Sequence, residues 1–227
     1  KEYIKKYNIN PQKIIWICNG VNLEQFDNAE SIEPYPEIVG DFIKYREKFK
    51  VIYIGAHGPA NGLEDVVNAA NLLFKKSPDI HFFLVGDGIE KKKLIQKAKE
   101  NNIDNITFLN AVPKLQVPSI LQKADLLIIC GINLKLYKYG ISPNKLFDYL
   151  ASKRPIIMSG NFSNNIVRDA KAGITVEPED AKALAEGILR IKKMSPEERR
   201  KLGVNGRAYV EKYHSTQVLG DILEKIL

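Results

Sequence analysis

The chain contains 227 residues, with 34 Lys and Arg against 27 Asp and Glu, which gives a formal net charge of +7. Hydrophobic residues make up 44% of the sequence and charged residues 27%, a composition that excludes disordered and fibrous proteins. Two cysteines, Cys18 and Cys130, are too few for a disulfide scaffold or a thiolate metal site. No apolar run reaches the ~18 residues of a membrane span. We therefore expect a globular, cytoplasmic chain.

Patterns in the first 50 residues indicate how the chain is divided into domains. The chain starts at Lys1, inside a helical pattern, and lacks the apolar stretch of a signal peptide, so we expect a fragment of a longer protein. A β-branched run at 13–18 predicts a strand that is separate from the later ones, and Pro34 and Pro36 interrupt the segment that follows. We predict that residues 1–21 end a preceding domain, 22–48 form a linker, and 49–227 form an α/β domain with C-terminal helices.

From residue 49 onward, short apolar runs alternate with helical patterns. Six runs are continuous and often β-branched, as in strands that are buried on both faces; they lie at 51–55, 80–86, 105–109, 125–129, 154–158 and 173–176. Helical periodicity lies at 62–76, about 89–101, 117–123, 180–194 and from Ser195 onward. This alternation predicts a Rossmann-like, doubly wound parallel sheet of six strands with helices on both faces.

Basic residues cluster at 91–93, 192–193 and 199–201, each on an expected helix with acidic residues nearby. Solvated helix faces explain these clusters best, and contact with an anionic membrane surface or an anionic substrate is the alternative. Because no aromatic residues alternate with the basic runs, we do not expect nucleic acid as a partner.

Ligands of doubly wound sheets bind at the carboxyl ends of the strands, where two glycine-rich loops are expected. In the first, Gly55 and Gly58 would let a phosphate approach the backbone ahead of a helix N-terminus, although a plain turn explains it equally well. His57 in this loop is interpreted as a hydrogen-bonded loop residue rather than a catalyst. In the second, Asp87 between two glycines could accept a hydrogen bond from a sugar or ribose hydroxyl, but tight turns use the same sequence.

A third loop, at residues 139–151, combines a glycine with a helix start. Ser142 is the expected N-cap and Pro143 the first helical residue. Lys145 and Asp148, three residues apart, should share one side of the helix. This arrangement presents free N–H groups, an ammonium and a carboxylate to a phosphate-containing ligand; the alternative is a surface ion pair between the two side chains.

Motifs of self-contained catalytic centres are absent from the sequence. There is no HExxH, no Cys/His cluster, no GxSxG and no evident pair of catalytic carboxylates. We therefore expect neither a metal nor a cofactor, and interpret the chain as a nucleotide- or phosphate-binding domain.

Seven ordered segments carry a resemblance to a known family: residues 19–22 with Phe26, the strand that ends at Gly55, 85–88, 106–109, 124–125, 148–157 and 173–178. Together they resemble the retaining family 4, or group 1, glycosyltransferases of the GT-B fold. Residues 142–148 are similar to its bacterial surface-polysaccharide branch, which includes transferases of amino-deoxy sugars such as fucosamine.

The resemblance implies that this chain is the C-terminal half, which binds a nucleotide-diphospho-sugar, with a lean to UDP. A preceding domain would bind a sugar or lipid-linked acceptor, at the cytoplasmic side and with peripheral membrane contact as an option. Asp148 matches the second acid of the family's E-x7-E pattern, which grips the ribose hydroxyls. The base would lie along Leu109, Asn110, Ala111 and Val112, and the diphosphate would lie within the turn at Ile141 to Asn144.

Three positions depart from the family pattern. The first acid of E-x7-E falls on Gly140, and the usual phosphate-clamping Arg and Lys fall on Ala56 and Asn61. We expect Lys145 to neutralise the diphosphate instead, with Lys138 as a second candidate. The assigned diphosphate set is Gly55, Gly58, Ser142, Asn144 and Lys145, and the catalytic groups are expected partly in the preceding domain.

Other functions fit the same fold type. A non-catalytic nucleotide-binding or interaction module is the main alternative, because the chain by itself has no expected acceptor site. An NAD-dependent oxidoreductase would need a glycine fingerprint that the segment at 55–58 lacks. A GT-B epimerase or phosphorylase is a third alternative, and nothing in the sequence announces the pyridoxal-bearing lysine site of a phosphorylase. We also expect this chain alone to transfer no sugar.

Overall fold

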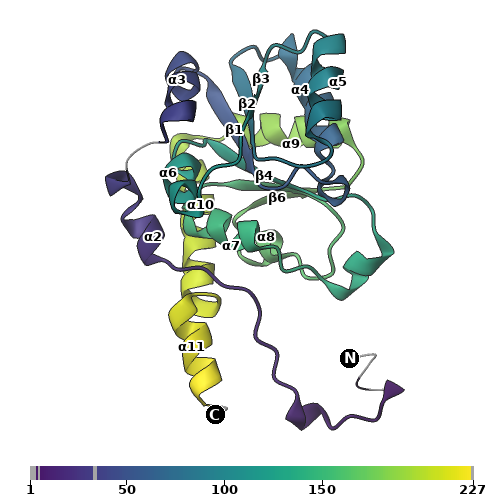
Figure 1. Ribbon diagram of the computed structural model, residues 1–227, viewed down its shortest axis with the longest axis vertical. Helices are drawn as coiled ribbons and strands as arrows, with labels where there is room; N and C mark the ends of the chain where they lie inside the picture. Colours follow the sequence, from purple (N-terminus) through teal and green to yellow (C-terminus); the bar gives the residue numbers. More distant parts are fainter. Residues whose placement is uncertain (1–3, 5, 33–34, 226–227) are drawn as a thin grey trace.

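The computed structural model describes residues 4, 6–32 and 35–225. Its centre is a sheet of six parallel strands in the order β3-β2-β1-β4-β5-β6, with helices on both faces (Figure 1). The strands are β1 (Phe49–Ile54), β2 (Ile80–Val85), β3 (Ile106–Leu109), β4 (Leu126–Cys130), β5 (Ile156–Ser159) and β6 (Gly173–Val176). The predicted doubly wound sheet is confirmed.

The helices divide between the two faces because alternate strand residues point to opposite sides. One face packs against α4 (Leu63–Phe74), α5 (Lys91–Glu100) and α9 (Ala181–Lys193). The other face packs against α3 (Pro36–Lys44), α6 (Val117–Leu121), α7 (Asn144–Ala151), α8 (Ile166–Asp169) and α10 (Pro196–Tyr213). The chain order reverses between β1 and β4, so this is where the fold places a ligand cleft.

The segment predicted as a linker contains regular structure. It holds α2 (Glu24–Asp27), a short 3-10 turn (Ala29–Ser31) and α3. Phe42 of α3 stacks on Phe83 of β2, with 4.6 Å between ring centroids. Pro36 is the first residue of α3, a position that proline favours, so this proline begins a helix that the sequence analysis did not predict. The domain boundaries at 21 and 48 stay predictions, and residues 1–3, 5, 33–34 and 226–227 lie outside the described part.

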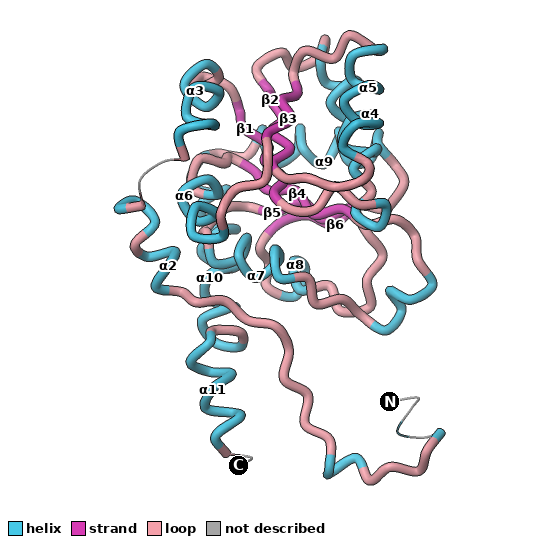
Figure 2. Tube along the Cα trace, in the orientation of Figure 1, coloured by secondary structure: helices cyan, strands magenta, loops and turns pink. Residues whose placement is uncertain are grey.

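The predicted strand at 13–18 is wrong in this structure. Residues 11–13 form a 3-10 turn, and residues 14–18 belong to no strand. Figure 2 shows this stretch as an extended loop that leaves the domain. Its apolar side chains have no neighbouring strand in the described chain, and Trp16 is 76% exposed. Further along the chain, Val21 forms an isolated parallel β-bridge with Ser215. Ser215 directly precedes α11 (Thr216–Glu224).

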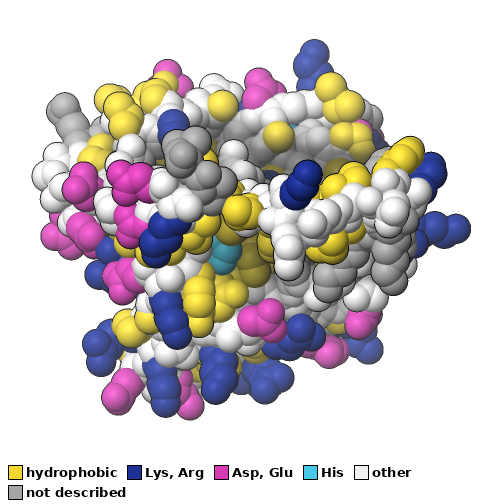
Figure 3. Space-filling model, turned by 90° about the horizontal axis from the view of Figure 1, so that it is seen from below, with side chains coloured by type: hydrophobic (Ala, Val, Ile, Leu, Met, Phe, Trp, Pro, Cys, Tyr) yellow, Lys and Arg dark blue, Asp and Glu magenta, His cyan; other side chains and the backbone are white. Residues whose placement is uncertain are grey.

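No helix in the described residues is long and apolar enough to cross a membrane. Figure 3 shows basic and acidic side chains around one face of the molecule, with no continuous basic surface there. Acidic partners accompany two of the basic clusters, since Lys93 pairs with Glu64 and Lys192 pairs with Asp79.

His81 on β2 is a buried histidine that we expect to make the stability of the fold sensitive to acid. Its ring lies under Tyr45, with 3.5 Å between centroids, and its Nε2 is 2.8 Å from Thr107 Oγ1. Burial first, and then the nearby Lys44 and Lys48, lower the pKa of His81 to about 4. Since the unfolded chain binds a proton that the folded chain excludes, stability should fall as the pH drops from about 6.5 to about 4.

We expect His81→Gln, which can still hydrogen-bond Thr107 but does not titrate, to lose roughly 1–2 kcal/mol less than the wild type between pH 7 and pH 5. Urea unfolding at the two pH values measures this difference. Because His57 and His214 remain in both proteins, equal losses would show that His81 does not contribute to acid sensitivity.

Candidate nucleotide-binding site

Helix α7 positions the central side chains of the candidate site. It begins at Asn144 with Pro143 at the N-cap, and no side chain caps it. The predictions of Ser142 as the N-cap and of Pro143 as the first helical residue are therefore each wrong by one position. The Ser142 carbonyl instead accepts a hydrogen bond from Asn19 Nδ2 at 2.5 Å, and its hydroxyl accepts one from the Asn19 N–H at 3.4 Å. The loop before α7 is thus tied to the N-terminal segment.

Lys145 points from α7 to the end of β1. Its ammonium donates to the Tyr53 hydroxyl at 2.6 Å and to Asn61 Oδ1 at 2.8 Å. It also lies 4.3 Å from the centroid of the Tyr53 ring. Burial lowers the pKa of Lys145 to about 8, an effect that the nearby Cys130 thiol opposes. A surface ion pair between Lys145 and Asp148 is therefore excluded, because Lys145 is bonded to other groups.

Asp148 lies one turn further along α7 and is 8% exposed. Its carboxylate forms an ion pair with Lys114, which follows β3 in the chain. Burial raises the pKa of Asp148, while the hydrogen bond and charge of Lys114 act in the opposite direction. The next residue, Tyr149, accepts a hydrogen bond from the Ile54 N–H at 2.7 Å and donates one to the Ile54 carbonyl. These bonds fix α7 against the end of β1.

Two cavities meet at Lys145. The first, here called the β1–β2 cavity, has a volume of about 380 Å³; Gly55, Asp87, Ala111, Val112, Lys114 and Asp148 are among its lining residues. The second, the β4–α7 cavity, has a volume of about 360 Å³; Asn61, Cys130, Tyr137, Gly140, Ser142 and Phe162 are among its lining residues. Lys145 lines both. Its ammonium is bonded to Asn61 of one lining and lies next to Gly55 of the other, so it lies between two spaces at the carboxyl edge of the sheet.

The loop after β3 is held in place by Lys91. Its ammonium donates to the carbonyls of Gly86 and Leu109, each at 2.9 Å, and to Asn110 Oδ1 at 3.0 Å. Interpreting Lys91 as part of a solvated helix face was therefore wrong. Ala111 and Val112 line the β1–β2 cavity, whereas Leu109 is buried in the core.

A side chain at position 140 would strain the backbone and crowd Asn164. The φ of Gly140 is +93°, and a Cβ there would come within 2.8 Å of Asn164 Oδ1. The Asn164 amide pairs with both the N–H and the carbonyl of Ile141, each at 2.7 Å. No Asp or Glu is among the residues that line the β4–α7 cavity in the described chain.

Six candidate residues lie apart from the two cavity linings: His57, Gly58, Leu109, Asn110, Lys138 and Asn144. His57 is fully buried, and neither of its ring nitrogens has a hydrogen-bond partner among the described atoms. Burial lowers its pKa to about 4. The prediction that His57 is a hydrogen-bonded loop residue is therefore wrong for its side chain. The ammonium of Lys138 lies over the Tyr139 ring.

The Gly86-Asp87-Gly88 segment leads out of β2, and the turn lies after it, at residues 89–90. Asp87 Oδ1 accepts a hydrogen bond from the Gly88 N–H at 2.7 Å, and the Asp87 carbonyl accepts one from the His57 N–H at 2.7 Å. A bond to the loop after β1 thus holds the Asp87 backbone, and the Asp87 side chain lines the β1–β2 cavity.

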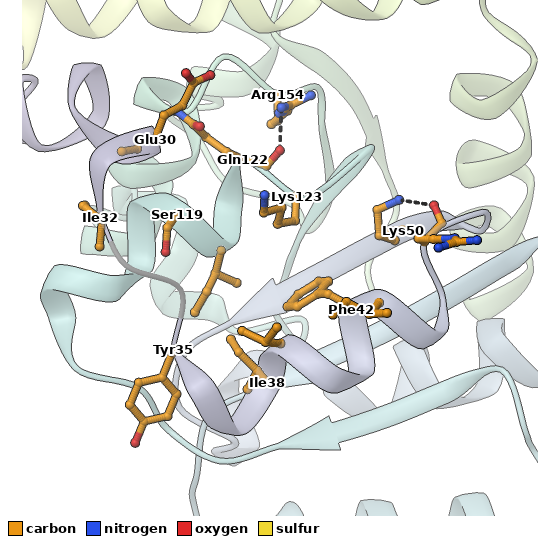
Figure 4. A pocket seen from close by; sticks show the side chains of 15 residues that line it. Glu30, Ile32, Tyr35, Ile38, Phe42, Lys50, Ser119, Gln122, Lys123 and Arg154 are labelled. Carbon is orange, nitrogen blue, oxygen red and sulfur yellow. Dashed lines mark hydrogen bonds between the residues drawn. The ribbon is translucent and has the colours of Figure 1, made fainter.

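A larger cavity than these two lies elsewhere in the described part of the chain. It has a volume of about 800 Å³ and lies between α3 and α6 (Figure 4). Ile38, Phe42 and Tyr35 contribute apolar walls, while Lys50 and Arg154 lie at the amino ends of β1 and β5. Because ligands of this fold bind at the opposite edge of the sheet, the size of this cavity does not make it the nucleotide site.

The sequence is similar to curated glycosyltransferases. It is 27% identical over 218 residues to an uncharacterized glycosyltransferase of Methanocaldococcus jannaschii, covering 93% of this chain and 53% of the relative. The capsular polysaccharide biosynthesis glycosyltransferase CapM of Staphylococcus aureus is 24% identical, with 92% and 52% covered. The alpha-D-kanosaminyltransferase of Streptomyces kanamyceticus is 23% identical, with 78% and 44% covered. The chain thus spans about half the length of these relatives.

Solved structures show the same fold. Anabaena HepE in complex with UDP and glucose superposes with a TM-score of 0.76 at 14% identity, covering 99% of this chain and 60% of that one. The C-terminal domain of the group 1 glycosyltransferase LpcC from Francisella tularensis gives a TM-score of 0.67 at 21% identity, with 87% and 100% covered. The fold is therefore that of a GT-B C-terminal domain. The family model for glycosyl transferases group 1 matches residues 35–209, and the chain belongs to this family.

Proposed function

We propose that this domain binds a nucleotide-diphospho-sugar, with UDP as the nucleotide, for retaining sugar transfer in polysaccharide or glycoconjugate biosynthesis. The observation that carries the proposal is the position of the Lys145 ammonium, where the β1–β2 and β4–α7 cavities meet. A diphosphate at this junction would place its nucleoside in one cavity and its sugar in the other. The structure of HepE with UDP and glucose and the role of CapM in capsule biosynthesis support this assignment.

In this proposal, the β1–β2 cavity takes the nucleoside. Asp148 would accept hydrogen bonds from the ribose hydroxyls, and the backbone at Ala111 and Val112 would flank the base. Lys114 pairs with Asp148, and its positive charge opposes the rise in the pKa of Asp148 that burial causes. The β4–α7 cavity would take the donor sugar.

Departure of the nucleoside diphosphate places negative charge on the leaving phosphate, and fixed positive charge there lowers the barrier. Lys145 and the N–H groups at the start of α7 would supply this stabilisation, and we assign no metal ion or cofactor to the site. The acceptor, a sugar or a lipid-linked sugar, would bind to a preceding domain. We place the enzyme in the cytoplasm, with peripheral contact to the membrane as part of the same proposal.

Calorimetric titration with UDP, GDP, ADP and NAD tests the assignment. We expect UDP to bind, and Asp148→Ala to weaken its binding about tenfold, as loss of hydrogen bonds to a charged acceptor implies. Asp104→Ala, which removes an exposed carboxylate, is the matched control and should bind as the wild type does.

A ribose-specific readout separates the role of Asp148 from general damage. The wild type should bind 2′-deoxy-UDP more weakly than UDP, and this preference should disappear in Asp148→Ala. Equal preference in both proteins would contradict the assignment of Asp148 to the ribose. Preferred binding of NAD would overturn the proposed function altogether.

A further inference from the structure

Tyr53 is a buried tyrosine near the end of β1, with no exposed surface. Its hydroxyl donates to the Ala56 carbonyl at 2.7 Å and accepts a hydrogen bond from Lys145 at 2.6 Å. We infer that Tyr53 is a positioning residue of the donor site, which fixes the Lys145 ammonium to the loop after β1 and holds it where the two cavities meet. The identity of the ligand in this inference rests on the proposed function, whereas the hydrogen bonds of Tyr53 do not depend on it.

The direction of the hydrogen bonds is set by the protonation of the phenol. Burial raises the pKa of Tyr53 far above its ordinary value, so the hydroxyl keeps its proton. The hydroxyl donates this proton in its hydrogen bond to the Ala56 carbonyl. The lone pairs of the hydroxyl oxygen are therefore free to accept the hydrogen bond from Lys145. One hydroxyl thus links a β1 loop to a side chain of α7.

The partners of Lys145 are neutral, and this matters for an anionic ligand. Tyr53 and Asn61 offer an oxygen each, and the Tyr53 ring offers its negative face 4.3 Å from the ammonium. A carboxylate in their place would neutralise the lysine before a phosphate arrived. Neutral acceptors stabilise the ammonium in its buried position while leaving its full charge available.

Other titratable groups surround Lys145. His57 from the β1–α4 loop and Cys130 at the end of β4 both interact electrostatically with it. Asp148 and its partner Lys114 face the same β1–β2 cavity, as does Asp87. Removal of the Tyr53 hydroxyl alone leaves all of these side chains in the protein. A shift in the titration midpoint of Lys145 can then be assigned to the lost hydroxyl.

Tyr53→Phe tests the inference, since it keeps the ring and removes only the oxygen. We expect UDP to bind about tenfold more weakly at pH 7, because a hydrogen bond to a charged group is lost, while uridine binding stays unchanged. We also expect the titration midpoint of the Lys145 side chain, followed by NMR in the ligand-free protein, to move to lower pH. Tyr213→Phe, which removes the hydroxyl of a half-exposed tyrosine at the end of α10 that lines neither cavity, is the control.

The two readouts separate this inference from the proposed function. If the wild type binds no nucleotide, the proposed function fails, and the NMR titration still decides the role of Tyr53. An unchanged Lys145 midpoint in Tyr53→Phe overturns the inference, as does an equal loss of UDP and uridine binding. Thermal unfolding of both variants shows that each is folded.

Discussion

Lys145→Met should bind UDP about 30- to 100-fold more weakly than the wild type at pH 7. The substitution keeps the aliphatic stem of the side chain but removes the positive charge that lies at the junction of the two cavities. Hydrogen bonds to charged groups contribute about 1.5–3 kcal/mol, and two phosphate groups share this ammonium in the proposed complex. Isothermal calorimetry measures the loss, and uridine, which carries no phosphate, should bind both proteins equally.

The pH dependence of UDP binding provides a second signature of Lys145. Only the ammonium form attracts phosphate, and the pKa of Lys145 in the free protein is about 8. As the pH rises through this value, binding must take up a proton, so UDP affinity should fall. The diphosphate itself is fully ionised above pH 7 and adds little in this range.

In Lys145→Met, UDP affinity should therefore be flat between pH 7 and pH 9. Lys92→Met removes an exposed lysine from α5 and should behave as the wild type does, including its decline above pH 8. A variant at position 145 that keeps the wild-type affinity and pH profile would show that the lysine does not contact phosphate.

The sheet could be predicted from sequence because each strand signals its own burial. The run Val51–Ile54 is apolar on both faces, and the structure buries all four residues. Such a run fits few environments other than the middle of a covered parallel sheet. The helix at 36–44 was missed because Pro34 and Pro36 suggested a linker. The contact that holds this helix on the sheet, Phe42 stacked on Phe83, joins residues far apart in the chain.

The candidate site was predicted only in part. Lys145 and Asp148 were identified from a loop and helix start that are contiguous in sequence. Lys91 and Lys114 were missed because their partners lie on other elements. Lys91 bonds the carbonyls of Gly86 and Leu109, and Lys114 pairs with Asp148. No local pattern distinguishes these lysines from solvated ones.

Tyr53 did carry a signal that could have been used. It is the one residue with a polar group in the apolar run 51–54, and a buried hydroxyl needs a hydrogen-bond partner. Its location near the carboxyl end of β1 placed that partner near the ligand edge of the sheet. The identity of the partner, a lysine 92 positions later, required the structure.

Gly86→Ala should destabilise the domain by about 3 kcal/mol or more. The φ of Gly86 is +144°, and a Cβ there would come within 1.9 Å of the Gly55 carbonyl oxygen. Both groups belong to backbone that is fixed at strand ends, so neither can move aside cheaply. Strained φ and a backbone clash each cost on the order of 1–3 kcal/mol. Urea unfolding measures the difference in free energy.

Gly220→Ala is the matched control, because a Cβ at this exposed position of α11 meets nothing within 4 Å. Helix propensity makes that change neutral or stabilising by up to ~1 kcal/mol. Equal unfolding midpoints for Gly86→Ala and the wild type would contradict the close approach of the two loops. Since Gly55 and Gly86 both line the β1–β2 cavity, their contact also sets the separation of its walls. Any Gly86→Ala protein that folds should therefore bind UDP more weakly, although position 86 offers no side chain to the nucleotide.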